Sequence, residues 1–149
     1  MSSFGRFDCE LRSSLPATLE AVEVFFVEFR RRGEAMMERA DCFAAELLVR
    51  EALTNAVVHG CGSDPGKQVR CRLRLRKGRL LIAVADDGAG FDWRTARHST
   101  AATSECSGRG MEILRQYANR VRFNDKGNAV TIIKQIEGGT RYDNGNQGR

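Results

Sequence analysis

The 149-residue sequence lacks the marks of a membrane, secreted or fibrous protein. No run approaches the about 18 apolar residues of a transmembrane helix, and the amino terminus lacks the apolar core of a secretory signal peptide. Only 2 prolines and 15 glycines stand among 42% hydrophobic and 29% charged residues, which excludes collagen-like, low-complexity and wholly disordered classes. We therefore expect one globular domain, without membrane contact, in the cytoplasm.

Cysteine pairs and the common nucleotide-binding fingerprints are also missing. The 5 cysteines are odd in number, widely spaced and without a CxxC pair, which argues against a disulfide framework and a zinc site. Neither GxxxxGK[ST] nor GxGxxG occurs, and this excludes Walker and Rossmann sites. We expect free thiols and no site of these types.

The charge balance is basic, with 24 Lys and Arg against 19 Asp and Glu and a formal net charge of +5. Such a balance suggests either nucleic acid or an acidic protein as a partner. Over residues 69–76, arginines alternate strictly with apolar residues, as in a strand with one dry and one wet face. This strand has no aromatic residue for base stacking, so we expect no direct contact with nucleic acid.

Hydrophobic periodicity predicts an α+β two-layer sandwich. Strands are expected over residues 4–11, 69–76 and 80–85, with a late hairpin built from residues 121–123 and 129–136. One helix is expected to start at the Ser13–Pro16 segment and end at Gly33; others span residues 41–60 and 110–118. The mostly antiparallel strands place the helices on one face of the sheet. Residues 1–137 form the expected domain, 93–107 a mobile loop and 138–149 a flexible tail.

Glu51 and Asn55 stand out in the otherwise apolar second helix. Four residues apart, they project from one helix face within a single turn. A buried carboxylate costs several kcal/mol unless it is paired or used. This helix alone does not decide between two roles. In a structural role, Glu51 would pair with an arginine and Asn55 would cap a neighbouring backbone; in a functional role, the two side chains would serve a site.

Two glycine-rich segments add chemistry to this pair. The run DDGAG, residues 86–90, ends an apolar strand, where glycines permit close approach of a ligand and Asp86 can accept a hydrogen bond from an exocyclic amine. The run SGRGM, residues 107–111, opens a helix whose first N–H groups favour phosphate. Taken singly, each run is also an ordinary turn or helix start.

In this order, EALTNAVVHG, DDGAGF and GRGMEIL resemble the motifs of the Bergerat-type ATP-binding fold (GHKL) that gyrase, histidine kinases and MutL share. More narrowly, the sequence is similar to the bacterial anti-sigma serine kinases of the RsbW and SpoIIAB type. The resemblance covers residues 4–136, and its most specific part is the stretch Glu51–Gly60. It implies that ATP and Mg²⁺ are the cofactors.

The resemblance also implies a role for each matching residue. Asn55 is expected to hold Mg²⁺, Glu51 to act as the general base toward a substrate serine, and Asp86 to bind the adenine amino group. Residues 93–107 would form a lid over ATP. The remaining nucleotide-binding residues implied are Gly88, Gly90, Gly108, Arg109, Gly110, Met111 and Thr131, the last in place of a family threonine that here is absent after Gly127.

The function implied by the resemblance is that of a serine protein kinase and anti-sigma regulator. Such a protein phosphorylates a small STAS-domain antagonist (the anti-anti-sigma protein), sequesters a sigma factor or an equivalent partner, and forms a homodimer. The alternative is a nucleotide-binding interaction module that holds its partner without phosphotransfer. His59 and His98 are expected to be a helix-end residue and a loop residue, since Glu51 already fills the role of base.

Overall fold

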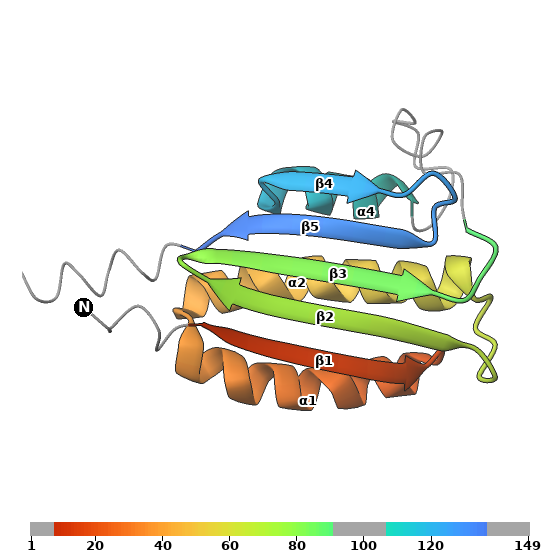
Figure 1. Cartoon of the computed structure of the whole chain (residues 1–149), viewed down its shortest axis with the longest axis horizontal. Coiled ribbons are helices and arrows are strands. Elements are labelled where there is room, and N and C mark those ends of the chain that lie inside the picture. Colours follow the sequence, from red (N-terminus) through yellow and green to blue (C-terminus); the bar gives the residue numbers. More distant parts are fainter. Residues whose placement is uncertain (1–7, 91–106, 137–149) are drawn as a thin grey trace, which may run out of the picture.

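The fold is a single antiparallel sheet covered on one face by helices (Figure 1). The computed structural model describes residues 8–90 and 107–136. The strands pair in the order β1-β2-β3-β5-β4, with every neighbour antiparallel. Their bounds are β1 Cys9–Pro16, β2 Gln68–Arg76, β3 Arg79–Asp86, β4 Arg120–Phe123 and β5 Ala129–Gln135. The expected α+β two-layer architecture is confirmed.

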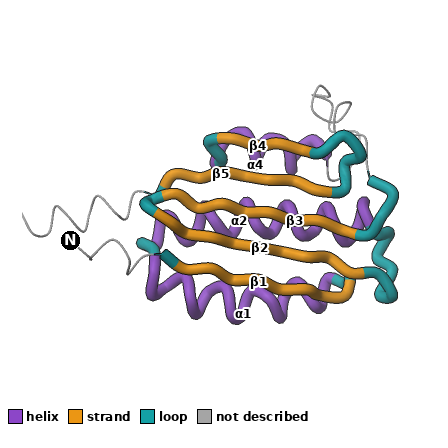
Figure 2. The backbone as a smooth tube through the Cα atoms, in the orientation of Figure 1, coloured by secondary structure: helices purple, strands orange, loops and turns teal. Residues whose placement is uncertain are grey.

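The helices all lie behind the sheet in the view of Figure 2. Helix α1 spans Leu19–Met36, α2 spans Arg39–Asn55, and α4 spans Ser107–Tyr117. Alternation along the strands explains this arrangement: Cys71 in β2 is buried opposite Val84 in β3, while Arg70 and Arg72 point to the other face. The sheet therefore has a helix-covered face and an open face.

The first strand runs further than the sequence indicates. Expected over residues 4–11 with a helix start at Ser13, it instead continues through Pro16, and Ser14 pairs with Arg70 of β2. Pairing with β2 outweighs the local capping chemistry of the serines, and a proline is tolerated at the end of an outer strand. The helix cap is Thr18, whose Oγ1 accepts a hydrogen bond from the Ala21 N–H at 3.1 Å.

Helix α1 also passes the glycine at which it was expected to stop. It continues through Gly33 to Met36, and Gly33 is buried against the Cys42 side chain. Its aromatic stripe packs edge to face under the sheet, with 5.3 Å between the ring centroids of Phe25 and Phe26. Leu19, the first residue of the helix, is 50% exposed.

Helix α2 is central, as its apolar sequence indicates. Ala52, Leu53 and Val57 are buried between the sheet and the flanking helices. The helix begins at Arg39, slightly before the expected Asp41, and after Asn55 it widens into the π-helical turn η2, Ala56–Gly60. Such wide turns are frequent at functional sites. This one leads the chain to the end of β3.

Helix α4 and strands β4 and β5 agree with the sequence prediction, except that α4 starts earlier than expected. Helix α4 begins at Ser107, three residues before the expected Gly110, and the β4–β5 hairpin turns over residues 124–128. The expected loop at 93–106 and tail at 138–149 lie outside the described residues. Within the described ranges, every helix is too short or too polar to cross a membrane.

Candidate functional site

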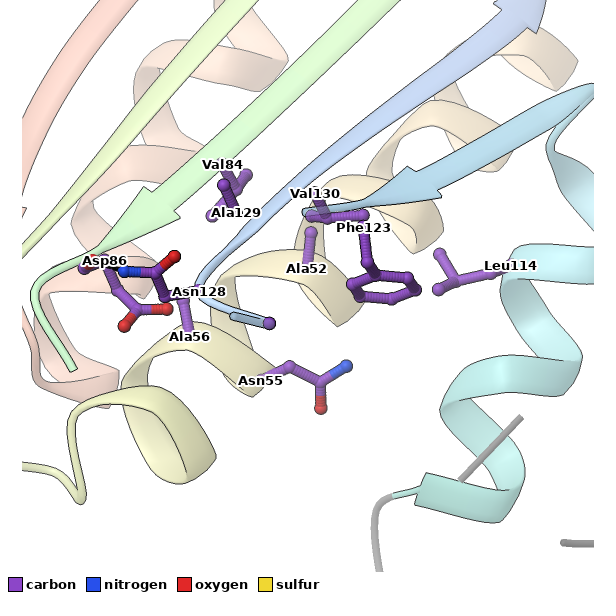
Figure 3. Close-up of a pocket in the computed structure, with 11 residues that line it drawn as sticks. Ala52, Asn55, Ala56, Val84, Asp86, Leu114, Phe123, Asn128, Ala129 and Val130 are labelled. Carbon is purple, nitrogen blue, oxygen red and sulfur yellow. Dashed lines mark hydrogen bonds between the residues drawn. The ribbon is translucent and has the colours of Figure 1, made fainter. Parts of the chain in front are cut away.

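A pocket opens where the end of α2, the end of β3 and the β4–β5 turn meet (Figure 3). It encloses about 360 Å³, part of it open to solvent. One wall is apolar, from α4 and the β4–β5 hairpin, and the polar groups stand at the end of β3 and on α2. The lining residues are Ala52, Asn55, Ala56, Val84, Asp86, Leu114, Phe123, Gly127, Asn128, Ala129 and Val130.

Asp86 is the buried carboxylate of this pocket, with 5% of its surface exposed. Its Oδ1 accepts a hydrogen bond from the Gly88 N–H at 2.7 Å, while its main chain exchanges hydrogen bonds with Asn128 across the strand end. Burial raises the pKa of Asp86, and the Gly88 hydrogen bond opposes that rise. The second oxygen, Oδ2, is the atom that remains to accept an amine from a ligand in the pocket.

Glycines hold the chain close around this carboxylate. A Cβ on Gly88 would overlap the Gly60 carbonyl, and a Cβ on Gly60 would overlap the Asp86 carboxylate. Gly90 has φ +94°, a conformation that favours glycine, and it lies so close to the Lys126 carbonyl that a Cβ would overlap this group. Gly88 and Gly90 are not among the residues that line the pocket; they let the backbone pass close behind Asp86 and beside the β4–β5 turn.

Glu51 and Asn55, one helical turn apart near the end of α2, form a second group of polar side chains. Asn55 points from α2 toward the pocket opening (Figure 3), and its side-chain amide acts to lower the pKa of Glu51. Burial is the larger effect on Glu51 and raises its pKa. Gly110, in the first turn of α4, packs directly on that carboxylate, because any Cβ there would overlap it.

The polar side chains of the pocket suit a nucleotide that binds together with a divalent cation such as Mg²⁺. Asn55 lines the pocket, and its side-chain Oδ1 is an oxygen ligand of the kind that a hard cation such as Mg²⁺ prefers. No three His, Cys, Asp or Glu side chains gather into a metal-ligand set within the described ranges. A metal at Asn55 would thus draw its remaining ligands from phosphate and water, which is the usual manner of Mg²⁺ in nucleotide sites.

Some of the predicted residues lie away from the pocket. Met111 is buried in the hydrophobic core beneath α4. Thr131 alternates with Val130 and Ile132, which face the helices, so it lies on the open face of the sheet and does not line the pocket. Residues 108 and 109 are within α4, and their side chains are outside the description.

The apolar wall was missed by sequence reasoning. Phe123 and Leu114 lie next to each other on one side of the pocket, and Asn128 lies beside Asp86 (Figure 3). Phe123 and Asn128 flank the hairpin turn, which the sequence does locate. The signal was therefore present, but only the sheet order, with β5 next to β3, brings this turn to Asp86.

Comparison with known proteins agrees with this geometry. Residues 13–134 match the histidine kinase-like ATPase domain. The anti-sigma F factor of Geobacillus kaustophilus is 32% identical over 60% of this chain and 66% of its own length. The serine-protein kinase RsbW of Bacillus subtilis is 31% identical over 62% of this chain and 64% of its own length.

The anti-sigma F factor of Shouchella clausii, at 28% identity, likewise aligns over 66% of its length, so the match spans just under two thirds of these relatives. The family match covers most of the described sheet and helices, including Glu51, Asn55 and Asp86. The chain therefore belongs to the histidine kinase-like ATPase family, and its expected resemblance to anti-sigma factors and serine-protein kinases of the RsbW and SpoIIAB type is confirmed.

Proposed function

We propose that the chain is an ATP- and Mg²⁺-dependent serine protein kinase that acts as an anti-sigma regulator in the cytoplasm. The single observation that carries this proposal is the Glu51–Asn55 pair, in which a half-buried carboxylate lies one helical turn from Asn55, whose amide lines the pocket that also contains Asp86. This arrangement offers a general base (Glu51), a cation ligand (Asn55) and a carboxylate that can recognise adenine (Asp86).

Asp86 is the proposed adenine-binding residue. Its buried position and its Gly88 hydrogen bond fix the carboxylate in one orientation, and the apolar side chains of Phe123 and Leu114 suit the faces of a purine ring. Asn55 would hold Mg²⁺ through Oδ1, and the bound cation would neutralise charge on the phosphates. Backbone N–H groups in the first turn of α4, which includes Gly110, are the proposed phosphate donors.

Glu51 is the proposed general base. A serine hydroxyl oxygen attacks the γ-phosphorus, the bond between that phosphorus and the bridging oxygen breaks, and ADP departs. The hydroxyl proton passes to the Glu51 carboxylate. The raised pKa of Glu51 makes it a better proton acceptor than an exposed glutamate and leaves it ionised above that pKa.

The proposed partners follow the relatives' names. The similar proteins are called anti-sigma F factor and serine-protein kinase, so we propose a sigma factor or equivalent as the sequestered protein. The STAS-domain antagonist expected from the sequence is the proposed phosphoryl acceptor, and the proposed active form is a homodimer. Phosphorylation of the antagonist would then decide which partner is held.

Transfer of labelled γ-phosphate to the STAS protein encoded beside this chain's gene tests the proposal. We expect Mg²⁺-dependent phosphoserine with the wild type and with Glu112→Gln, an exposed α4 control. Glu51→Gln should abolish transfer while calorimetry shows ATP binding unchanged. Absence of transfer by the wild type in the presence of bound ATP would overturn the kinase assignment and leave a binding module.

One observation favours that second candidate, a nucleotide-binding module without phosphotransfer. The Glu51 carboxylate is packed against Gly110 of α4, a contact that a purely structural carboxylate also makes. In that case Glu51→Gln would alter neither ATP affinity nor partner affinity, and no phosphoserine would form. The same two measurements therefore separate the candidates.

A further inference from the structure

The open face of the sheet gathers the chain's excess positive charge. In β2 and β3, buried residues alternate with more exposed ones, and the exposed set lies on the face of the sheet opposite the helices, which Figure 1 shows behind the sheet. The face carries eight arginines against three carboxylates, an excess of five that equals the formal net charge of +5 of the whole chain. The arginines are Arg12, Arg70, Arg72, Arg74, Arg76, Arg79, Arg120 and Arg122; the acids are Asp8, Glu10 and Asp87.

An apolar centre lies between the basic rows. Leu81 of β3 and Ile133 of β5 are direct cross-strand partners and are half-buried. Arg74 pairs with Leu81 on one side, and Arg120 pairs with Ile133 on the other. One line across the sheet thus runs from basic through apolar to basic. Such a pattern, an apolar centre with an arginine-rich border, is typical of protein interfaces.

Half of the arginines have their charge already matched. Arg12 and Arg72 share the Glu10 carboxylate, at 2.6 and 2.7 Å, and Arg70 donates to Asp87 at 2.8 Å. The Arg76–Asp8 pair is longer, at 3.9 Å. Among the eight arginines of this face, those with no ion pair to a described residue lie beside the apolar centre and along its border: Arg74, Arg79, Arg120 and Arg122.

We propose that this open face docks an acidic protein surface that carries apolar side chains at its centre. Carboxylates of the partner would pair with the four unmatched arginines, and its apolar residues would cover Leu81 and Ile133. Arginine suits this role because its planar guanidinium binds carboxylates in a bidentate manner. The face is on the opposite side of the sheet from the helices, so the inference stands independently of the kinase proposal.

The other occupants fit the charge less well. Residues 1–7 carry one arginine and no acid, while 91–106 and 137–149 each hold two acids and two arginines, so none of these three segments is net acidic. A second copy meeting face to face would bring arginine rows together. A nucleic acid would meet the interleaved carboxylates, and the strand residues of this face include no aromatic side chain for stacking.

Fluorescence anisotropy with a labelled synthetic peptide that alternates leucine and glutamate tests the proposal at physiological ionic strength. We expect binding to the wild type and to Arg39→Glu, a control on the helix side in the first turn of α2. The double variant Arg74→Glu/Arg120→Glu should lose at least about tenfold in affinity, and Leu81→Ser should lose affinity at unchanged charge.

A milder pair, Arg74→Gln/Arg120→Gln, guards against misfolding, with thermal melting as the check on each variant. It should lower affinity by less than the glutamate pair while retaining the wild-type melting temperature. Equal binding of the peptide by wild type and both pairs would overturn the proposal. So would tighter binding of a DNA oligonucleotide than of the peptide, or a wild-type dimer in sedimentation that Leu81→Glu disrupts.

Discussion

Gly110 of α4 lies directly on the Glu51 carboxylate of α2, so close that a Cβ at position 110 would overlap the carboxylate unless the Glu51 side chain moved. The two residues are far apart in the sequence, yet the first turn of α4 and the middle of α2 meet here because both cover the same face of the sheet. The position of the proposed base is therefore fixed by a glycine on another helix.

Gly110→Ala should destabilise the protein. In an ordinary helix this change gains up to about 1 kcal/mol, because glycine has poor helix propensity. Here the new Cβ overlaps Glu51, so we expect a loss of about 1–3 kcal/mol, measured by urea denaturation. Gly33→Ala in α1 is the matched control: its Cβ would meet the Cys42 Sγ at 3.5 Å, an ordinary contact, so stability should rise.

The same change in a Glu51→Ala background isolates the contact. With the carboxylate removed, Gly110→Ala should recover most of its loss, and the coupling free energy should exceed about 1 kcal/mol. Additive effects would show that Gly110 is required for another reason.

Asp86→Asn should weaken nucleotide binding without weakening the fold. An asparagine Oδ1 still accepts the Gly88 N–H, but the charged acceptor for the adenine amine is gone, so ATP affinity should fall about 10- to 100-fold in calorimetry. Asp87→Asn, exposed and paired with Arg70, serves as the control.

Although Asp86→Asn should weaken ATP binding, it should not lower the free energy of unfolding at neutral pH. Because burial raises the folded-state pKa of Asp86, the folded protein binds more protons between the ordinary and the raised value. Wild-type stability therefore contains a contribution that falls as pH rises through that window, and Asp86→Asn should lack it. A lower free energy of unfolding for the variant at neutral pH would contradict this account.

Phosphotransfer should lose activity on acidification earlier than an exposed glutamate would predict. The base must be ionised, and burial raises the pKa of Glu51 from its ordinary 4.5, with the Asn55 side chain opposing the rise. With saturating ATP and Mg²⁺, the rate should climb with pH, with a midpoint above 4.5, and then level off. A midpoint at or below that value would remove Glu51 from the role of base.

Asn124→Ala should loosen the hairpin wall of the pocket. The Asn124 Oδ1 accepts hydrogen bonds from the N–H groups of Gly127, Asn128 and Ala129, at 2.8, 3.0 and 3.2 Å. Loss of this acceptor should cost about 1–2 kcal/mol of stability and weaken ATP binding. Asn124→Asp keeps the acceptor and loses the 2.7 Å donation to Asn128, so it should fall between alanine and wild type.

The sequence predicted the elements well and the contacts between them poorly. Alternation along residues 69–76 and the apolar second helix depend on local period, and both are confirmed. Ser13 and Ser14 have the local chemistry of a helix start, but eight paired positions with β2 place them in a strand. Local propensity was outweighed there by pairing that no local pattern reveals.

The candidate site shows the same division. The spacing of Glu51 and Asn55 correctly puts them within one turn, because helical period is a local property. Sheet order and the π-helical turn produce two contacts that local spacing does not reveal: the close approach of Gly88 to Gly60, and the position of Asn128 beside Asp86. Thr131 differs by one position from Val130, which lines the pocket, and one position in a strand selects the opposite face.

The outer strands limit how this chain can associate. At one edge, β1 ends in Pro16, which lacks an N–H; at the other, β4 has only 4 residues and bears Arg120 and Arg122. Short, charged or proline-ended edges resist the addition of a further strand and so guard against aggregation. A sheet protected in this way is not readily extended, so growth into fibrils through edge pairing is disfavoured.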